Sequence, residues 1–384
     1  MLSENRKHLI LRELALKGSL NASEFAAQIG TSGMTVRRDL AILEKRGLVE
    51  RVHGGAIAVS DAAGPQQPLQ VPAGRVPQRG AVATIGMIVP SASYYFSGVI
   101  RGAETAAREA GVRLILGVSN YSSTEEQRQL QRMYDLGVDG ILVTPSEASL
   151  SDTETLDLLA AAAVPVVVVE RSIEDALDRG DFECVRSDHA QGARIAVAHL
   201  QELGHQRVAL CLRENSPTAP PLIEGFAQAM EKAGLRANPA NTMVRTMSRA
   251  RNDPQAHHEL VADILDWCIR EKVTAAIVHT DEDALQFASV CQERAIRVPE
   301  DFAIIAYDDE IAALGTTPLT AVAPPKFDVG HQALMMCANR VISRRPGPTA
   351  RQRVNLSPTL VVRNSTLPEG AEPGLSVLSR GSRA

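Results

Sequence analysis

Cysteine, aromatic side chains and long apolar runs are all scarce in this sequence of 384 residues. The five cysteines are odd in number and widely separated, which excludes a disulfide framework and gives no metal-site spacing. The longest apolar run, 158–169, is interrupted by Pro165 and is shorter than the roughly 18 residues of a membrane span. The N-terminus contains Glu4 and lacks the apolar segment of a secretory signal. We therefore expect a cytoplasmic protein with reduced cysteines, no membrane segment, no metal and no cofactor.

Charge is distributed unevenly along the chain. Residues 1–60 contain nine Lys and Arg against six Asp and Glu, a formal charge of +3, whereas the whole chain has a net charge of −5. A small basic segment attached to a larger acidic body is typical of a head that meets a polyanion. A solvated basic surface is the alternative explanation.

The length and local composition predict four segments. The chain is too long for one ordinary core. Residues 60–81 hold four prolines and four glutamines with no apolar period, so we predict a flexible linker between a head at 1–59 and a body at 82–364. The last twenty residues, 365–384, have a similar composition and are predicted to be a disordered tail.

The body alternates apolar strands with amphipathic helices. Examples are the predicted strand 84–90, helix 97–110 and strand 112–118, and later the strand 302–306. The strands are rich in Val and Ile without in-out alternation, as parallel strands buried between helix layers are. Two runs of such units predict an α/β fold with two lobes of doubly wound parallel sheet, whose ligand binds at the strand C-termini.

The head contains a basic helix followed by a hairpin. A helix over about 33–46, with Ser32 placed to cap it, has an apolar face of Val36, Leu40 and Leu43. A helix that buries one stripe and presents a basic second stripe has the form of a recognition helix in the major groove. The following segment, 48–59, contains a Gly-Gly turn between two apolar runs and predicts a β-hairpin that forms a wing.

This head closely resembles the DeoR-type winged helix-turn-helix. That family ends its recognition helix with Thr-(Ile/Val)-Arg-Arg-Asp-Leu and continues with Arg-x-His-Gly-Gly-Ala, and residues 35–40 and 51–56 match nearly every position. The resemblance implies that double-stranded operator DNA is the partner and that the arginines contact phosphate or guanine edges, while Asp39 orients an arginine. The candidate DNA-binding residues are Ser32, Thr35, Arg37, Arg38, Lys45, Arg51 and His53.

The body resembles the sensor domain of the LacI/GalR regulators, which has the periplasmic-binding-protein fold. The segments "AYDDE" (306–310) and "LGHQRV" (203–208) are the most specific parts of this resemblance, which covers about 84–364. It implies two hinged lobes around a small ligand, usually a sugar or a nucleobase. The DeoR-type head replaces the head usual in that family, and residues 60–81 lack its hinge helix.

Candidate ligand-binding residues follow the predicted strands or begin the next helix. Carboxylates suit vicinal hydroxyls because each accepts two charge-assisted hydrogen bonds. The aromatic trio 94–96 predicts a stacking wall for a sugar face, with core packing as the alternative, and Asp281 is equally explained as a helix-start charge. The candidates are Tyr94, Tyr95, Phe96, Asn120, Glu170, Arg171, Asp188, Leu222, Thr280, Asp281 and Asp308.

Two positions predict a neutral ligand. The resemblance implies an arginine that clamps ligand oxygens at the position of Leu222, and a polar glutamine is frequent at that of Pro324. Their absence makes the pocket less cationic and disfavours a phosphorylated or acidic ligand. We expect a sugar or polyol.

A ligand-controlled transcriptional repressor accounts best for these patterns. We expect a homodimer, because a helix-turn-helix monomer contacts only a half-site. A sugar-metabolising α/β enzyme, a kinase or a dehydrogenase, is the alternative from another class. It is disfavoured because GxGxxG is missing after the first strand and GxxxxGK[ST] is missing from the sequence.

Overall fold

The computed structural model describes most of the body and part of the head. The described residues are 10, 19–22, 25–26, 31–45, 49–52, 55–58, 82–176, 180, 182–213, 215–234, 243–247, 254–342 and 350–367. The chain divides into two compact units, 1–77 and 78–384. Residues 1–18 apart from residue 10, the predicted linker up to residue 81 and the chain after 367 lie outside the described residues.

The described part of the head includes helix α3 and a small antiparallel sheet. Helix α3 (Gly33–Lys45) packs on strands in the order β1-β3-β2, where β2 and β3 form the predicted hairpin. The third strand, β1, was not predicted, and its Asn21 pairs with Gly55 of β3. The strands are β1 (Ser19–Asn21), β2 (Val49–Val52) and β3 (Gly55–Ala58).

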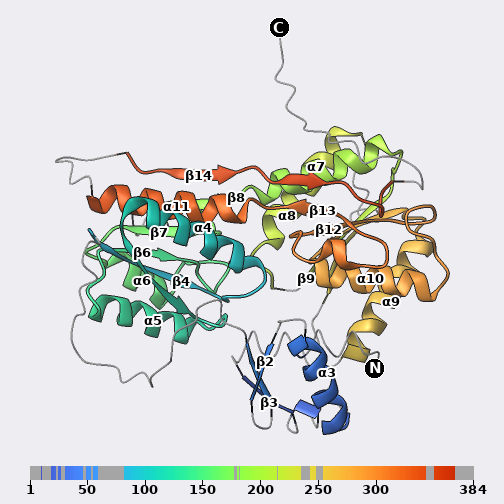
Figure 1. The fold of residues 1–384 in the computed structure, drawn as a ribbon. Coiled ribbons are helices and arrows are strands. Elements are labelled where there is room, and N and C mark those ends of the chain that lie inside the picture. Colours follow the sequence, from blue (N-terminus) through green and yellow to red (C-terminus); the bar gives the residue numbers. More distant parts are fainter. Residues whose placement is uncertain are drawn as a thin grey trace. The chain divides into compact units, whose positions relative to one another are not determined.

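The first lobe of the body is a six-stranded, fully parallel sheet between two helix layers (Figure 1). Helices α4 and α11 cover one face, and α5 and α6 cover the other. The strands, in sheet order, are β14 (Arg353–Leu356), β8 (Glu183–Ser187), β7 (Val166–Val169), β6 (Gly140–Val143), β4 (Thr84–Val89) and β5 (Arg113–Val118). The helices are α4 (Tyr95–Ala110), α5 (Ser123–Asp135), α6 (Glu154–Ala160), the short η1 (Glu174–Ala176) and α11 (Lys326–Ile342).

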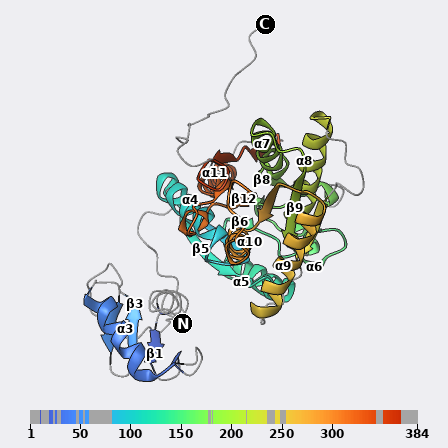
Figure 2. The same ribbon diagram turned by 90° about the vertical axis from the view of Figure 1, so that its right-hand side faces the viewer.

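The second lobe repeats this plan with one antiparallel edge strand, β15. Figure 2 shows α7 and α8 on one side of its sheet and α9 and α10 on the other. The strands, in sheet order, are β10 (Met243–Met247), β9 (Val208–Arg213), β11 (Ala275–His279), β12 (Ala303–Tyr307), β13 (Thr320–Ala323) and β15 (Thr359–Val361). The helices are α7 (His189–Glu202), α8 (Ala219–Lys232), α9 (Pro254–Arg270), α10 (Asp281–Glu293) and the short η2 (Ala312–Leu314).

The central strands of both sheets, such as β6, β11 and β12, are buried on both faces, as their composition predicts. In β4, Ile85, Met87 and Val89 face the α4–α11 layer, whereas Ile88 faces the α5–α6 layer. The α/β prediction with two parallel-sheet lobes is therefore confirmed. All five cysteines are buried and free, and no described helix is long and apolar enough to cross a bilayer.

The chain passes between the lobes after β8, after β13 and after β14. As a result the C-terminal segment completes both sheets, and the beginning of the predicted tail belongs to the second lobe. Ser365 is fully buried and donates its hydroxyl hydrogen to the carbonyl oxygen of Ile304. The prediction of a disordered tail was wrong for its first residues, because their hydroxyls satisfy polar groups of the sheet.

Helices α4 and α11 pack with almost no space between their backbones. A Cβ atom on Gly102 would lie 1.9 Å from the carbonyl oxygen of Phe327, and one on Gly330 would lie 1.8 Å from that of Val99. Only glycine permits this approach, which brings the start of α11 to the edge of the first lobe.

Candidate DNA-binding and effector-binding sites

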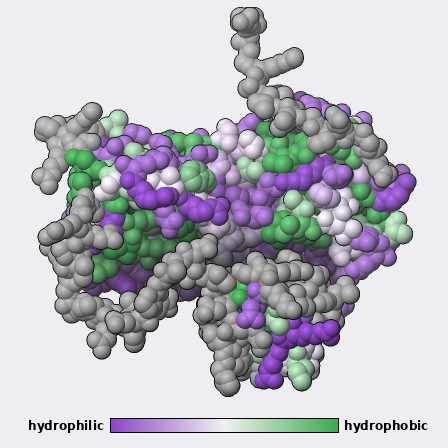
Figure 3. Space-filling model, in the orientation of Figure 1, coloured by the Kyte–Doolittle hydropathy of each residue, from purple (hydrophilic) through white to green (hydrophobic). Residues whose placement is uncertain are grey.

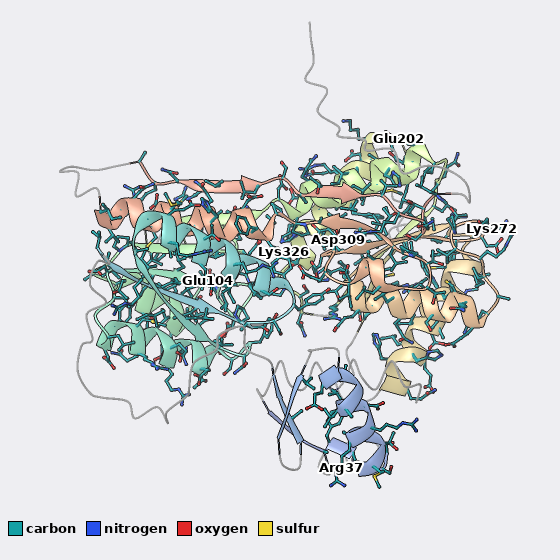
Figure 4. All side chains as sticks on the ribbon, in the orientation of Figure 1. Arg37, Glu104, Glu202, Lys272, Asp309 and Lys326 are labelled. Atoms are coloured by element: carbon teal, nitrogen blue, oxygen red, sulfur yellow. The ribbon has the colours of Figure 1, made fainter. Side chains whose placement is uncertain are left out.

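Helix α3 separates an apolar face from an exposed polar face. Val36, Leu40 and Leu43 are buried in the core of the head, whereas Arg37 and Arg38 are exposed. Figure 3 shows hydrophilic residues over much of the described surface of the head, and Figure 4 places Arg37 at that surface. The two guanidinium groups are therefore accessible to a polyanion.

The hydroxyls at the start of α3 act as a helix cap. Ser32 Oγ accepts the backbone N–H of Thr35 at 3.2 Å, and the two side-chain oxygens lie 2.7 Å apart in a mutual hydrogen bond. Asp39 is buried. The side chains of Lys45 and Arg51, and the whole of His53, lie outside the described residues, so their predicted DNA contacts stay predictions.

A second group of predicted residues lies where the lobes meet, at the C-terminal ends of their strands. Glu170 follows β7, and its carboxylate accepts hydrogen bonds from the Tyr95 hydroxyl at 2.7 Å and from the Ser187 hydroxyl and N–H at 2.8 and 3.0 Å. His189, at the start of α7 in the second lobe, lies 3.8 Å from the same carboxylate. Glu170 thus connects side chains of both lobes in this polar cluster.

Asp281 organises the second lobe's side of the interface. Its fully buried carboxylate accepts backbone N–H groups from Asp309, Glu310 and Ile311 at 3.1, 2.5 and 2.9 Å. These bonds hold the loop that follows β12, which carries Asp308. These bonds match neither of the two explanations given for Asp281, a helix-start charge or a ligand contact. The carboxylate of Asp281 instead positions the neighbouring loop.

Asp308 lies in an environment that disfavours its charge. It is buried, and burial together with the nearby carboxylate of Asp281 raises the pKa of Asp308 well above its usual value, which Lys326 and Arg213 partly offset. Burial and the same two carboxylates raise the pKa of Tyr94. Tyr94 belongs to the first lobe and both carboxylates to the second, so the cluster spans the interface.

Lys326 joins the two lobes and was missed in the sequence. It begins α11 in the first lobe, and its ammonium group donates to the carbonyl oxygen of Asp308 and pairs with Glu310 at 2.5 Å. The same group lies 5.4 Å from the centroid of the Tyr95 ring. Figure 4 shows Lys326 and Asp309 close together at the junction.

Several buried polar atoms at this interface have no hydrogen-bond partner among the described residues. They are the hydroxyl of Tyr94, Oγ1 of Thr280 and Nδ1 of His279. A buried polar group without a partner lowers the stability of the fold, and such atoms in a native protein commonly bind a ligand or water. These three atoms offer hydrogen bonds to a small polar molecule.

The backbone at the same edge adopts uncommon conformations. Tyr94, Asn120, Glu170 and Asp308 have positive φ angles of 53°, 52°, 57° and 106°, although none is glycine. Each follows a strand of one of the two sheets. A non-glycine residue held at positive φ destabilises the fold by about 1 kcal/mol or more, and such residues cluster at binding sites.

Not every predicted residue belongs to this cluster. Phe96 is packed in the core of the first lobe and Leu222 in that of the second, so neither forms a ligand-binding wall and core packing explains the former. Asn120 is exposed, and Asp188 caps α7 through the N–H of Gln191 at 2.8 Å. Arg171 donates to the carbonyl oxygens of residues 145 and 170 at 3.1 and 2.8 Å, which leaves it a structural role.

Arg213 supplies a cation that no local pattern in the sequence indicates. It ends β9, and its guanidinium donates to Asp283 at 2.5 Å and to Glu282 at 3.1 Å. Asp283 in turn lies 3.2 Å from Nε2 of His257. Arg213 is therefore neutralised by its own lobe.

Comparison with known proteins agrees with both halves of this architecture. Residues 6–62 match the model of the DeoR-like helix-turn-helix domain, and residues 197–366 match that of the periplasmic binding protein-like domain. The HTH-type transcriptional repressor PurR of Haemophilus influenzae is 30% identical, over 73% of this chain and 81% of its own length. The chain belongs to the LacI family of transcriptional regulators.

Two further relatives extend this result. The arabinose metabolism transcriptional repressor of Halalkalibacterium halodurans is 25% identical over 92% of both chains. A LacI family regulator from Enterococcus faecium, solved with bound ribose, superposes with a TM-score of 0.59 and 25% identity over 74% of this chain and 99% of its own. This LacI-family protein is thus a ligand-responsive transcriptional repressor with a DeoR-like DNA-binding head, and its relatives are regulators of transcription, not enzymes.

Proposed function

We propose that the polar cluster between the two lobes binds a neutral, polyhydroxylated effector, a sugar or a related metabolite, which controls operator binding by the head. The observation that carries this proposal is the set of unpartnered buried atoms on Tyr94, Thr280 and His279, beside the carboxyl group of Asp308. Hydroxyl groups both donate and accept, so a sugar satisfies all four positions at once.

The charges at the interface favour a neutral ligand. The carboxyl groups at the interface outnumber the cations. In addition, Arg213 and Lys326 are already paired with acidic side chains, and Arg171 is bound to backbone carbonyls. A phosphate or carboxylate would meet more carboxyl groups than cations among the described residues of this cluster, and its desolvation would be poorly offset. The carboxyl groups involved are Glu170, Asp281, Glu282, Asp283, Asp308 and Glu310.

The relatives support a sugar effector and a regulatory role. One is named for arabinose metabolism, and another was solved with ribose. Because these relatives are regulators, we take the protein to act by binding and not by turnover, in contrast to the sugar-metabolising enzyme considered above. Assays with sugars plus ATP or NAD distinguish the two functions: product formation would support the enzyme.

Operator binding is assigned to the exposed face of α3 in a homodimer that acts in the cytoplasm. Arg37 and Arg38 contact phosphate or guanine edges, and pairing of two bodies presents two heads to two half-sites. The effector acts on DNA affinity to the extent that it binds two arrangements of the lobes unequally.

The effector assignment is tested with the purified full-length protein. Isothermal titration against free pentoses, free hexoses and nucleosides, each beside its phosphorylated counterpart, should give binding to a free compound and not to its phosphate. Binding of the phosphates alone would contradict the proposal.

The head assignment is tested by Arg37→Ala and Arg38→Ala. Each should weaken binding to a selected operator by about 1–3 kcal/mol, because a guanidinium contact to phosphate or guanine is lost. Glu44→Ala, an exposed change on the same helix, is the control. Thermal unfolding of the body should be unchanged, and wild-type affinity in both arginine variants would refute the assignment.

A further inference from the structure

Met34 is an apolar side chain displayed on the recognition helix. Its side chain is 76% exposed, the largest fraction among the large apolar residues that the structure describes. It lies in the first turn of α3, three and four residues before Arg37 and Arg38, so the three side chains share one face of the helix. An exposed methionine gains nothing from the folded head, where any polar residue would be better solvated.

The described apolar and hydroxyl-bearing neighbours of Met34 are either buried in the core of the head or bonded to each other. Val36, Leu40 and Leu43 are buried and fix the rotation of α3 on the head's core. The hydroxyls of Ser32 and Thr35 are bonded to each other. The outward surface at the start of α3 therefore presents a thioether beside two guanidinium groups.

This combination has a specific counterpart in duplex DNA. Residues at the N-terminal end of a recognition helix contact base edges, and the C5 methyl group of thymine is the apolar feature of the major groove. Methionine is flexible and polarisable, so it adapts to such a group without a rigid fit. We propose that Met34 selects thymine, packing its thioether against the C5 methyl group of one thymine in each half-site. This inference depends on the proposed role of α3 as the DNA-contacting helix.

The test removes the methyl group from the DNA and the thioether from the protein. Operators are selected from a randomised duplex library with the full-length protein, and each thymine of the selected duplex is then replaced by uracil, which lacks only the C5 methyl group. Wild type should lose about fourfold in affinity for each substituted half-site at one thymine position. Met34→Ala should bind the thymine duplex more weakly and bind both duplexes equally.

Ile269→Ala is the matched control, because Ile269 is also apolar and 52% exposed but lies on α9 of the body. This variant should discriminate thymine from uracil as wild type does. Equal binding of both duplexes by wild type at every position, or discrimination retained by Met34→Ala, would overturn the inference while Arg37→Ala still loses affinity. Wild-type affinity in Arg37→Ala would instead overturn the proposed interface itself.

Discussion

At the scale of single residues, two histidines and Asp308 at the interface between the lobes have disfavoured charged forms. Burial, with a contribution from Arg171 and Arg186, lowers the pKa of His189 to about 3, and burial with Arg213 lowers that of His279 to about 3. Both imidazoles are therefore neutral at physiological pH. Nδ1 of His189 lies 3.0 Å from the hydroxyl of Tyr307, a hydrogen bond that suits the neutral ring.

This arrangement predicts how stability depends on pH. The unfolded chain takes up a proton on His189 near the ordinary pKa of 6.5, whereas the folded protein does not until about pH 3. Stability from this residue is therefore complete above pH 6.5 and is lost as the pH falls toward 3, about 2 kcal/mol by pH 5. His189→Asn places an amide near Tyr307 and removes the titration, so wild type should lose about 2 kcal/mol more than the variant between pH 7 and pH 5.

Urea unfolding of both proteins at the two pH values measures this difference. Carboxyl groups with raised pKa, such as Asp308, titrate in both proteins and largely cancel in the comparison. An equal loss of stability in both proteins would show that folding does not lower the pKa of His189.

At the scale of elements, the close approach of α4 and α11 places Lys326 at the edge of the first lobe. Gly102→Ala should destabilise the protein by about 2–3 kcal/mol, because the added methyl group meets the backbone of α11 and the helices must separate. Glu104→Ala, an exposed change on α4 (Figure 4), should stay within about 0.5 kcal/mol of wild type. Equal unfolding midpoints in urea for all three proteins would mean that the helices separate without cost.

The elements also show which features a single sequence predicts. The Val- and Ile-rich strands were identified because burial on both faces leaves a local signal. Strand β8 was missed because it contains Glu183, whose buried carboxylate is satisfied by Arg340 on α11 at 2.8 and 2.9 Å, a partner 157 residues away. Helix α11 and strands β13, β14 and β15 follow the last predicted unit and complete sheets begun much earlier.

Only part of the candidate site was predicted, because only some of its residues leave a local signal in the sequence. Residues that follow strands, such as Tyr94, Glu170 and Asp308, were found because strand ends are local features. Lys326 lies at a helix start, and only the crossing of the chain between the lobes brings it to Asp308. The sequence could not separate side chains that face the interface from the loop contacts of Asp281 or the core packing of Leu222, since the same residue types suit both.

At the scale of the whole molecule, Lys326 of the first lobe forms an ion pair with Glu310 of the second lobe. Lys326→Met keeps the apolar stem beside Tyr95 and removes the charge. We expect effector affinity to fall about tenfold, because the arrangement that encloses the effector loses a charge-assisted contact. Lys272→Met, an exposed change in the second lobe away from the junction (Figure 4), is the control, and titration calorimetry is the measurement. Unchanged affinity would show that the contact does not favour the effector-bound arrangement.

Control of the head by the body requires that effector and operator binding are energetically coupled. The coupling depends on differential effector affinity for two states and takes either sign, induction or corepression. A substitution of Asp308 is suited to test this coupling. Asparagine tolerates positive φ angles such as the 106° of this residue, and Asp308 lies in the body and not in the DNA-binding head.

The most direct test is an operator titration by fluorescence anisotropy, with and without the effector identified by calorimetry, for wild type and Asp308→Asn. The effector should change wild-type operator affinity by about 5- to 150-fold. Asp308→Asn should bind the operator as wild type does and should not respond at the same effector concentration. An identical response in both proteins would contradict control through the interface between the lobes.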